Sequence, residues 1–288
     1  MFLCDQWRDY EVLDTGDGEK LERWKDVVLR RPDPQVIWPR AKPALWEKAD
    51  ACYARSDTGG GRWTFARKLP ERWVMALGDL RFYVRPTGFK HTGLFPEQAV
   101  NWAFMRERIR RAAGRGEPVK VLNLFAYTGG ATLACAAEGA HVTHVDAAKG
   151  MVQWARENRD LSGIPQERTR FIVEDVKAFV QRELRRGNRY DGILMDPPSY
   201  GRGPNGEVWK LENELYGLTE LCVQALSATP AFFLINGYTT GFAASVLGNV
   251  LERCMGGAGH TEAEELALPV TTGGVLPCGA TARWTPDV

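Results

Sequence analysis

The chain lacks three features that would define its class at once: charge of one sign, a long apolar run and clustered cysteines. Its 37 basic and 36 acidic side chains nearly balance, which excludes a protein that coats polyanions over its whole surface. No run approaches the roughly 18 apolar residues of a membrane span, and the acidic start MFLCDQWRDYE does not resemble a signal peptide. The six cysteines are scattered without a CxxC pair, so we expect reduced thiols in a cytoplasmic protein rather than zinc ligands or disulfides.

Histidines give no better case for a metal. His141 and His144 lie three residues apart in a run that we expect to be a strand. Side chains at that separation point to opposite faces of a sheet, so the two imidazoles cannot easily share an ion. We therefore predict no metal site.

The second half of the chain alternates strand-like and helix-like segments. The expected strands are residues 119–125, 141–146, 170–175, 190–196 and 231–236, followed by two closing strands at 262–268 and 279–284. The expected helices are residues 131–138, 151–160, 176–186, 211–227 and 242–255. This alternation predicts an α/β fold with a doubly wound, mostly parallel seven-stranded sheet and an antiparallel edge. Ligands of such sheets bind in a crevice at the carboxyl ends of the strands.

The first part of the chain has a different pattern. Residues 62–68, 71–77 and 80–86 are short alternating runs that predict an antiparallel meander. We expect residues 1–88 to form a small β-rich α+β domain that recognises the substrate, and residues 89–288 to form the domain that carries the chemistry. About two domains is also what a chain of 288 residues suggests.

The residues after the first three parallel strands favour an adenosine-type ligand. Gly129 and Gly130 lie between a strand and a helix, where glycine lets the backbone approach a ligand closely. Asp146 ends the second strand, where an acid can accept both hydroxyls of a ribose. Glu174 and Asp175 end the third, where a carboxylate can accept from an adenine amino group. A nicotinamide cofactor is the rival interpretation, but the full GxGxxG spacing is absent.

The segment after the fourth strand distinguishes these ligands. It reads Asp196, Pro197, Pro198, Ser199 and Tyr200, and its two prolines fix the backbone so that the acid and the carbonyls point into the crevice. Such a segment suits gripping a flat polar substrate, such as a base edge, beside a methylsulfonium. A simple turn is the alternative interpretation.

These motifs resemble a known family. NLFAYTGG, VDAAKGMVQWARENRDLSG and MDPPSYGRG are similar to segments of class I S-adenosylmethionine-dependent methyltransferases. More narrowly, they resemble the bacterial ribosomal-RNA large-subunit base methyltransferases, and the resemblance covers roughly residues 80–285. In that group a segment like HTGLFPEQ (residues 91–98) closes over the cofactor, and a tail like LPCGATARW forms a closing hairpin.

The resemblance implies that the cofactor is S-adenosylmethionine, with S-adenosylhomocysteine as product. The residues that would line its methionine part are Asn123, Phe125, Ala126, Tyr127, Thr128, Gly129 and Gly130. The residues that would cover the cofactor are Thr92, Gly93, Phe95 and Gln98. Asp146 would bind the ribose beside Ala147, and Asp175 and Val176 would bind the adenine. Asp196 to Tyr200 would face the substrate, with Asp196 also at the cofactor.

Two departures from the group bear on the chemistry. We do not expect the RNA-binding module that often precedes the catalytic domain in this group, and no cysteine follows the fifth strand, which continues as Ile235-Asn236-Gly237-Tyr238. Methylation at cytosine C5 needs a thiolate that adds to C6. The nearest thiol in sequence, Cys222, lies inside an expected helix. We therefore predict direct transfer, with a ring or exocyclic nitrogen as acceptor, Asp196 accepting from an amine and Tyr200 stacking on the base.

Charge is uneven along the chain. Residues 51–116 contain 13 basic and 5 acidic residues, a net of +8, whereas the last 33 residues have a net of −3. The candidate RNA-binding residues are Arg62, Arg67, Lys68, Arg81, Arg85 and Arg202. Aromatic residues interleave with them, and two interpretations stay open: they stack on bases, or Trp63 with Phe65, and Phe82 with Val84, form an inward core face.

The sequence thus predicts an S-adenosylmethionine-dependent methyltransferase that acts on a base in ribosomal or other structured RNA. Two alternatives stay open: a methyltransferase of small molecules or proteins, and a non-catalytic RNA-binding relative. We expect no membrane partner, and the sequence leaves an oligomer possible.

Overall fold

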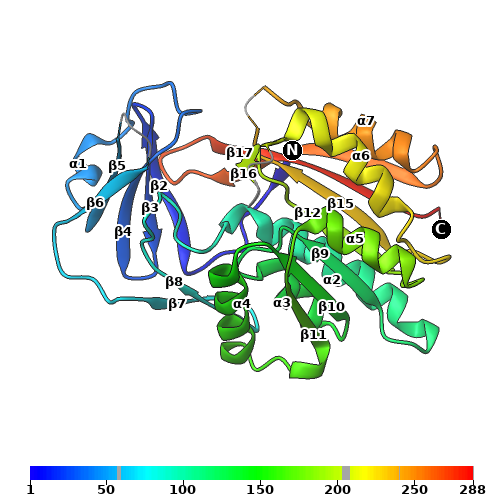
Figure 1. Cartoon of the computed structure of the whole chain (residues 1–288). Helices are drawn as coiled ribbons and strands as arrows, with labels where there is room; N and C mark the ends of the chain where they lie inside the picture. Colours follow the sequence, from blue (N-terminus) through cyan, green and yellow to red (C-terminus); the bar gives the residue numbers. More distant parts are fainter. Residues whose placement is uncertain (57–59, 203–207, 240, 288) are drawn as a thin grey trace. The chain divides into compact units, whose positions relative to one another are not determined.

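The computed structural model describes residues 1–56, 60–202, 208–239 and 241–287, without the side chains of Arg115 and Arg202 (Figure 1). The chain divides into two compact units. One, the α/β unit, consists of Met1, Asn101–Leu266 and Gly279–Val288. The other, the β unit, consists of Phe2–Val100 and Ala267–Cys278. The division thus falls after Val100 rather than at residue 88, because residues 89–100 bond to the rest of the β unit. A piece of the C-terminal region, Ala267–Cys278, belongs to this unit as well.

The α/β unit is built on a large twisted sheet with the strand order β1-β16-β17-β15-β12-β9-β10-β11. The strands are β9 (Lys120–Leu124), β10 (His141–Asp146), β11 (Thr169–Val173), β12 (Gly192–Met195), β15 (Phe232–Gly237), β16 (His260–Pro269) and β17 (Val275–Thr285), with β1 (Phe2–Leu3) at one edge. Strands β9, β10, β11, β12 and β15 pair in parallel, and β17 pairs antiparallel with β15. The predicted sheet with its antiparallel edge is confirmed, and the short β1 makes eight strands instead of seven.

Helices cover both faces of this sheet. They are α2 (Ala99–Ala112), α3 (Gly130–Ala137), α4 (Lys149–Leu161), α5 (Val176–Arg185), α6 (Leu211–Val223) and α7 (Ala244–Cys254), with 3-10 turns η2 (Ala113–Arg115) and η3 (Gln166–Arg168). Two short strands, β13 (Tyr200–Arg202) and β14 (Val208–Lys210), pair with each other before α6. No helix in the described part of the chain has both the length and the apolar character to cross a membrane.

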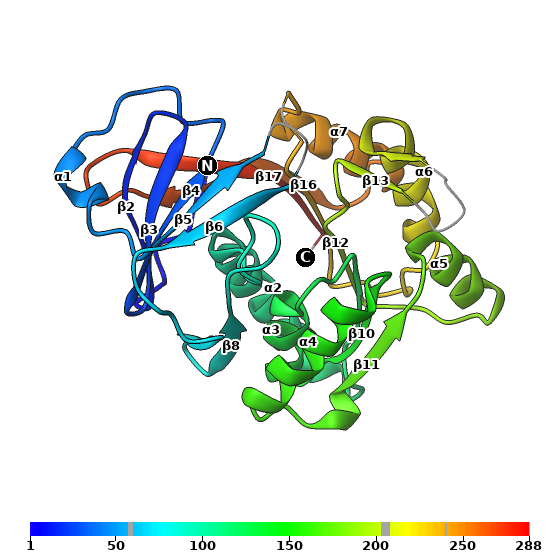
Figure 2. The same cartoon turned by 60° about the vertical axis from the view of Figure 1, so that its left-hand side comes forward.

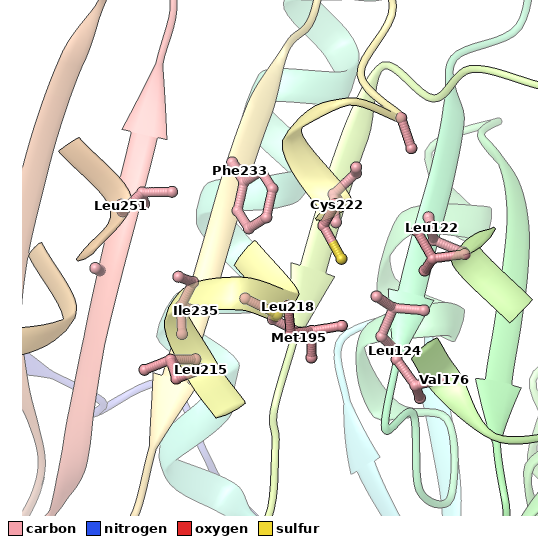
Figure 3. Packing of buried hydrophobic residues seen from close by; sticks show 14 of the residues in the cluster. Leu122, Leu124, Val176, Met195, Leu215, Leu218, Cys222, Phe233, Ile235 and Leu251 are labelled. Atoms are coloured by element: carbon pink, nitrogen blue, oxygen red, sulfur yellow. The ribbon is translucent and has the colours of Figure 1, made fainter. Parts of the chain in front are cut away.

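Successive side chains of the parallel strands point to opposite faces of the sheet, and each face is covered by a layer of helices. Leu122 and Leu124 of β9 pack with residues of α5, α6 and α7, and so do Ile193 and Met195 of β12 (Figure 3). The intervening side chains point to the other face. There Phe171 of β11 packs against α4, and Phe232 of β15 contacts Phe104 of α2. Both faces are buried, which is why these strands are almost continuously apolar in sequence.

The β unit contains a five-stranded sheet with sequential strand order, visible in Figure 2. Its strands are β2 (Tyr10–Gly16), β3 (Glu19–Trp24), β4 (Val27–Pro32), β5 (Ala51–Arg55) and β6 (Gly61–Phe65), with the short helix α1 (Pro43–Trp46) between β4 and β5. A separate hairpin joins β7 (Trp73–Leu77) to β8 (Leu80–Val84), and a 3-10 turn η1 (Pro96–Gln98) precedes α2. The predicted meander is therefore wrong for its first run, because β6 pairs with β5 and not with β7.

The C-terminal piece of the β unit is the turn region between β16 and β17. Val270 bridges to Val12 of β2, and the Thr272 hydroxyl donates to Asp14 at 2.6 Å. The backbone N–H of Cys4 donates to Ala267 at 2.9 Å. These bonds place residues from the end of the chain within the unit that begins it.

A buried ion pair crosses the middle of the five-stranded sheet. The guanidinium of Arg31 on β4 donates two hydrogen bonds to Glu22 on β3, at 2.6 and 2.7 Å, and Tyr10 on β2 donates a third. The Arg31 guanidinium and its neighbours hold the pKa of Glu22 at about 2 despite full burial. A charged pair inside the sheet breaks the apolar pattern by which strands are recognised in sequence.

Candidate active site

The predicted crevice lies at the carboxyl ends of β9, β10, β11 and β12, which are adjacent in the sheet. In the sheet, β10 and β11 follow β9 toward one edge, whereas β12 and β15 lie on the other side of β9 and follow each other toward the opposite edge. The reversal between β9 and β12 is a topological switch point, where ligands of open α/β sheets bind. Backbone bonds tie the loops together: Ala126 N donates to Val145, Glu174 N to Asp146, and Asp196 N to Leu124.

The loop after β9 has an unusual backbone. Phe125 and Tyr127 have φ values of +54° and +50°, and Gly129 has a φ of +88°. Such left-handed residues are uncommon outside glycine, and they cluster where a loop is shaped for a ligand. A Cβ on Gly129 would lie 3.0 Å from that of Ala155, and one on Gly130 would clash with the Trp102 ring. Both glycines are therefore required by the fold as well as by the expected ligand.

Asn123, expected at the methionine part of the cofactor, takes part in a buried polar chain. Its amide donates to the hydroxyl of Thr132 on α3 at 2.8 Å, and that hydroxyl lies 2.9 Å from Nδ1 of His144. All three side chains are buried beneath the start of α3. The side chain of Asn123 thus supports the loop from below, and His144 is part of the core, as its strand position predicted.

Burial lowers the pKa of His144 to about 3, and this sets a pH dependence of stability. The unfolded chain binds a proton at this histidine below about pH 6.5 while the folded chain does not, so the contribution is complete above that pH and is lost on acidification. We expect the free energy of unfolding to fall by about 2 kcal/mol between about pH 7 and pH 5 from this group.

Urea denaturation at both pH values measures the effect. His144→Gln should remove this part of the acid sensitivity, whatever it does to stability at neutral pH. His141→Gln, which replaces the exposed histidine at the start of the same strand, is the matched control. Equal acid sensitivity in the His144 variant and the wild type would contradict the assignment.

Asp146, expected at the ribose, is held by the backbone on both sides. One carboxylate oxygen accepts from Tyr127 N and the other from Ala148 N, each at 2.8 Å. Burial raises the pKa of this carboxyl, and the two N–H groups only partly offset it. Among the residues that the structure describes, no cation pairs with Asp146, so its remaining lone pairs suit neutral hydroxyl donors.

The acids after β11 differ in their surroundings. Asp175 is exposed and caps α5, with one oxygen accepting from Ala178 N at 2.9 Å, and Val176 is buried as the first residue of that helix. Glu174 forms an ion pair with Arg182. Each acid has one carboxylate oxygen engaged in these contacts, and the role of Asp175 at the adenine stays a prediction.

The Asp196–Tyr200 segment is braced by residues that the sequence did not single out. The Trp209 indole donates to the Pro198 carbonyl at 2.6 Å, and its ring lies 5.6 Å from that of Phe125. The Thr239 hydroxyl donates to the Ser199 hydroxyl at 2.7 Å. Asp196 and Ser199 are half-buried and Tyr200 is exposed, so an acid and an aromatic ring flank the rigid diproline at the surface of the crevice. Trp209 and Thr239 carry no motif, and only the fold brings them here.

Cys222 is unsuited to act as a nucleophile. It is fully buried in the core between α6 and the sheet (Figure 3), and burial raises the pKa of its thiol. Asn236, at the position where a cysteine would be expected, is buried and accepts from the Asn101 amide at 3.0 Å.

The expected covering segment, Thr92 to Gln98, is a well-bonded part of the β unit. The Pro96 carbonyl accepts from the Trp7 indole at 2.8 Å and from the Cys4 thiol at 3.1 Å. The Thr92 carbonyl accepts from Arg85 N at 3.0 Å. Thr92, Gly93 and Gln98 are buried within this unit and Phe95 is partly exposed, and their contact with a cofactor stays a prediction.

The candidate RNA-binding cations are not equivalent. Arg67 is ion-paired with Asp50, and Arg81 donates to the carbonyls of Gly78 and Leu80. Arg62, Lys68 and Arg85 are exposed. The side chain of Arg202 lies outside the described residues. Phe82 and Val84 are fully buried, which confirms that they form an inward core face. Phe65 is 53% exposed, so the same interpretation is wrong for it.

The donor set around the crevice distinguishes between possible cofactors. The loops 124–130, 146–148, 174–175 and 196–200 contain four acids and no basic residue. A cofactor with a pyrophosphate would meet repulsion from these acids, although Arg182 pairs with Glu174, whereas a nucleoside that carries a cationic sulfonium would not. The residues present therefore fit S-adenosylmethionine better than a dinucleotide.

The match to a known family agrees with this geometry. Residues 53–232 match the model of the S-adenosylmethionine-dependent methyltransferases, and the chain belongs to that family. It is an enzyme of this class, and S-adenosylmethionine is its cofactor.

Individual relatives add detail. A crystal structure of an S-adenosylmethionine-dependent methyltransferase from Agrobacterium tumefaciens is 38% identical, covers 99% of this chain and 93% of its own, and superposes with a TM-score of 0.93. "Ribosomal RNA large subunit methyltransferase K" of Neisseria meningitidis is 28% identical over 59% of this chain and 46% of its own length. The K/L enzyme of Pseudomonas putida is 34% identical over 56% of this chain and 21% of its own. The chain thus spans less than half the length of these curated relatives.

Proposed function

We propose that this methyltransferase transfers a methyl group directly to a ring or exocyclic nitrogen of a base in ribosomal RNA. The observation that carries this proposal is the Asp-Pro-Pro-Ser-Tyr segment, in which a half-buried acid and an exposed tyrosine flank a rigid diproline beside the switch point of the sheet. The names of the ribosomal-RNA relatives support the choice of substrate.

The chain's own residues would bind the cofactor as follows. Asp146 accepts from the ribose hydroxyls, with Ala147 beside the adenine, and Asp175 accepts from its amino group. The loop from Phe125 to Gly130 holds the methionine part with its backbone. Thr92, Gly93, Phe95 and Gln98 cover it. The cofactor supplies an activated methyl group on sulfur, and the protein contributes binding and alignment.

On the acceptor side, Asp196 accepts a hydrogen bond from the exocyclic amine and so orients the nitrogen lone pair toward the methyl group. Tyr200 stacks on the base. Trp209 and Thr239 fix Pro198 and Ser199, so this half of the crevice needs no rearrangement before the substrate arrives. The buried, protonated Cys222 supports a transfer without a covalent enzyme–base adduct.

The test is to incubate the protein with radiolabelled cofactor and ribosomal RNA from cells that lack it, and then to locate the modified nucleoside. A methylated purine or pyrimidine nitrogen is the expected result. Label at cytosine C5 would contradict direct transfer. Cofactor binding without transfer to any RNA would instead indicate a small-molecule or protein acceptor, and failure to bind cofactor would indicate a non-catalytic relative.

A further inference from the structure

The β unit has an exposed aromatic surface beside an open groove. Phe65 at the end of β6 is 53% exposed, and its ring stacks on Trp63 with centroids 6.4 Å apart and planes at 26°. A groove of about 590 Å³ is lined by Phe65, Ala66, Arg67, Lys68, Leu69, Pro70, Glu71 and Pro86. A large aromatic ring at the rim of a groove, open to solvent, marks a binding surface more often than a structural contact.

Trp63, on which the Phe65 ring stacks, is held in place by its own neighbours. Trp63 contacts Tyr53 edge to face at 5.3 Å, and its indole donates to the carbonyls of Thr87 and Phe89 at 2.9 and 3.3 Å. Phe89 is itself 66% exposed. These contacts fix Trp63, so the Phe65 ring stacks on a well-held neighbour while its other face is open to solvent.

Three charged residues line this groove: the basic Arg67 and Lys68, and the acidic Glu71. Lys68 is exposed and makes no ion pair with any residue described in the structure. Arg67 also lines the groove, although Asp50 pairs with it, and the exposed Arg85 precedes Pro86. Arg62 is excluded from this surface, because side chains alternate along β6 and it points to the face opposite Phe65.

We propose that this surface, Phe65 with the groove and Lys68, binds an unpaired segment of RNA by stacking a base on Phe65 and contacting a phosphate with Lys68. The inference rests on the proposed function for the identity of the ligand. An aromatic face stacks on any base, and a lysine beside it tracks the backbone, which is how proteins hold single strands without reading their sequence. Double-stranded RNA offers no free base face and would not use this surface.

The test uses the full chain and a ten-nucleotide oligoadenylate, with affinity measured by fluorescence anisotropy. Phe65→Ala should weaken binding by roughly 5- to 100-fold, and Phe65→Trp should restore it. An abasic oligomer of the same length should bind both proteins equally, because it keeps the phosphates but has no base to stack. Lys68→Ala should lower the slope of log affinity against log salt by about 0.7.

A matched variant controls for nonspecific effects. Tyr216→Ala removes an aromatic residue that is 44% exposed on α6 and should not reproduce the loss. Unchanged oligoadenylate affinity in Phe65→Ala would overturn the proposed surface, even if the wild type methylates RNA. A base-dependent loss in Phe65→Ala would support it, even if no methyl transfer to RNA is found, and only the proposed function would then fail.

Discussion

Replacing Asp196 by alanine is expected to lower the turnover number for methyl transfer in the cofactor-saturated enzyme by about 10²- to 10⁴-fold. The carboxylate follows β12 directly, and its backbone N–H is bonded to Leu124 across the switch point. Its backbone position is therefore fixed by the sheet, and the substitution removes the group that we propose to orient the acceptor. Single-turnover kinetics with RNA, combined with calorimetric titration of the cofactor, measures the transfer rate and the cofactor affinity separately.

Asp175→Ala is the control for this experiment. It removes an acid from the adenine side of the same crevice, so it should weaken cofactor binding and leave the transfer step in the saturated complex nearly intact. If Asp196→Ala retained full turnover with the cofactor bound, the acid would have no role in orienting the acceptor.

Replacing Asp146 by alanine should weaken S-adenosylmethionine binding on the order of 10²-fold. Two hydrogen bonds from ribose hydroxyls to a charged acceptor are lost, which corresponds to roughly 3 kcal/mol. The backbone N–H groups of Tyr127 and Ala148 also lose their acceptor, so the left-handed turn at Tyr127 becomes less well held. Equilibrium dialysis with labelled cofactor measures the dissociation constant directly.

Asp191 provides a matched comparison at the opposite, amino end of the same sheet. It too accepts from a backbone N–H of a neighbouring strand, Lys120 at 2.8 Å, and from the Ser227 hydroxyl at 2.7 Å. Asp191→Ala should reduce stability without changing cofactor affinity. Equal losses of affinity in the two variants would show that Asp146 acts through folding alone and would remove it from the ribose site.

The parallel sheet was predictable because its physics is simple. Strands buried on both faces are continuous apolar runs, and helices such as α4 and α5 between them are amphipathic, so β9 to β15 and their helices were expected within a few residues of their observed ends. The first 50 residues were expected only as β-rich. Strands β3 and β4 read as EKLERW and VVLRRP, and their charges are buried in pairs such as Glu22 with Arg31. Pairing between charges on different strands cannot be seen in the local pattern.

The active-site residues also fall into those that the sequence could predict and those that it could not. Glycines and acids at strand ends are visible in sequence because the topology sends all of them to one edge. Trp209 and Thr239 were missed, since nothing in their neighbourhood distinguishes an indole that braces Pro198 from one that fills a core. The sequence left the exposure of Phe65 open for a related reason: it shares a strand face with Trp63, and alternation alone does not reveal where the covering layer ends.

The turn region of Ala267–Cys278 has a consequence for how such a chain can evolve. Because this piece belongs to the β unit while the chain on either side of it belongs to the α/β unit, the chain passes between the units after Val100, after Leu266 and again after Cys278, in addition to the step from Met1 to Phe2. A single recombination event therefore cannot exchange or delete the β unit as an intact module, since a cut at residue 100 would leave its Thr272–Asp14 and Cys4–Ala267 bonds without partners. Inheritance of the two units should accordingly be joint, with new specificity arising by substitution on the surface of the β unit instead of by replacement of the whole.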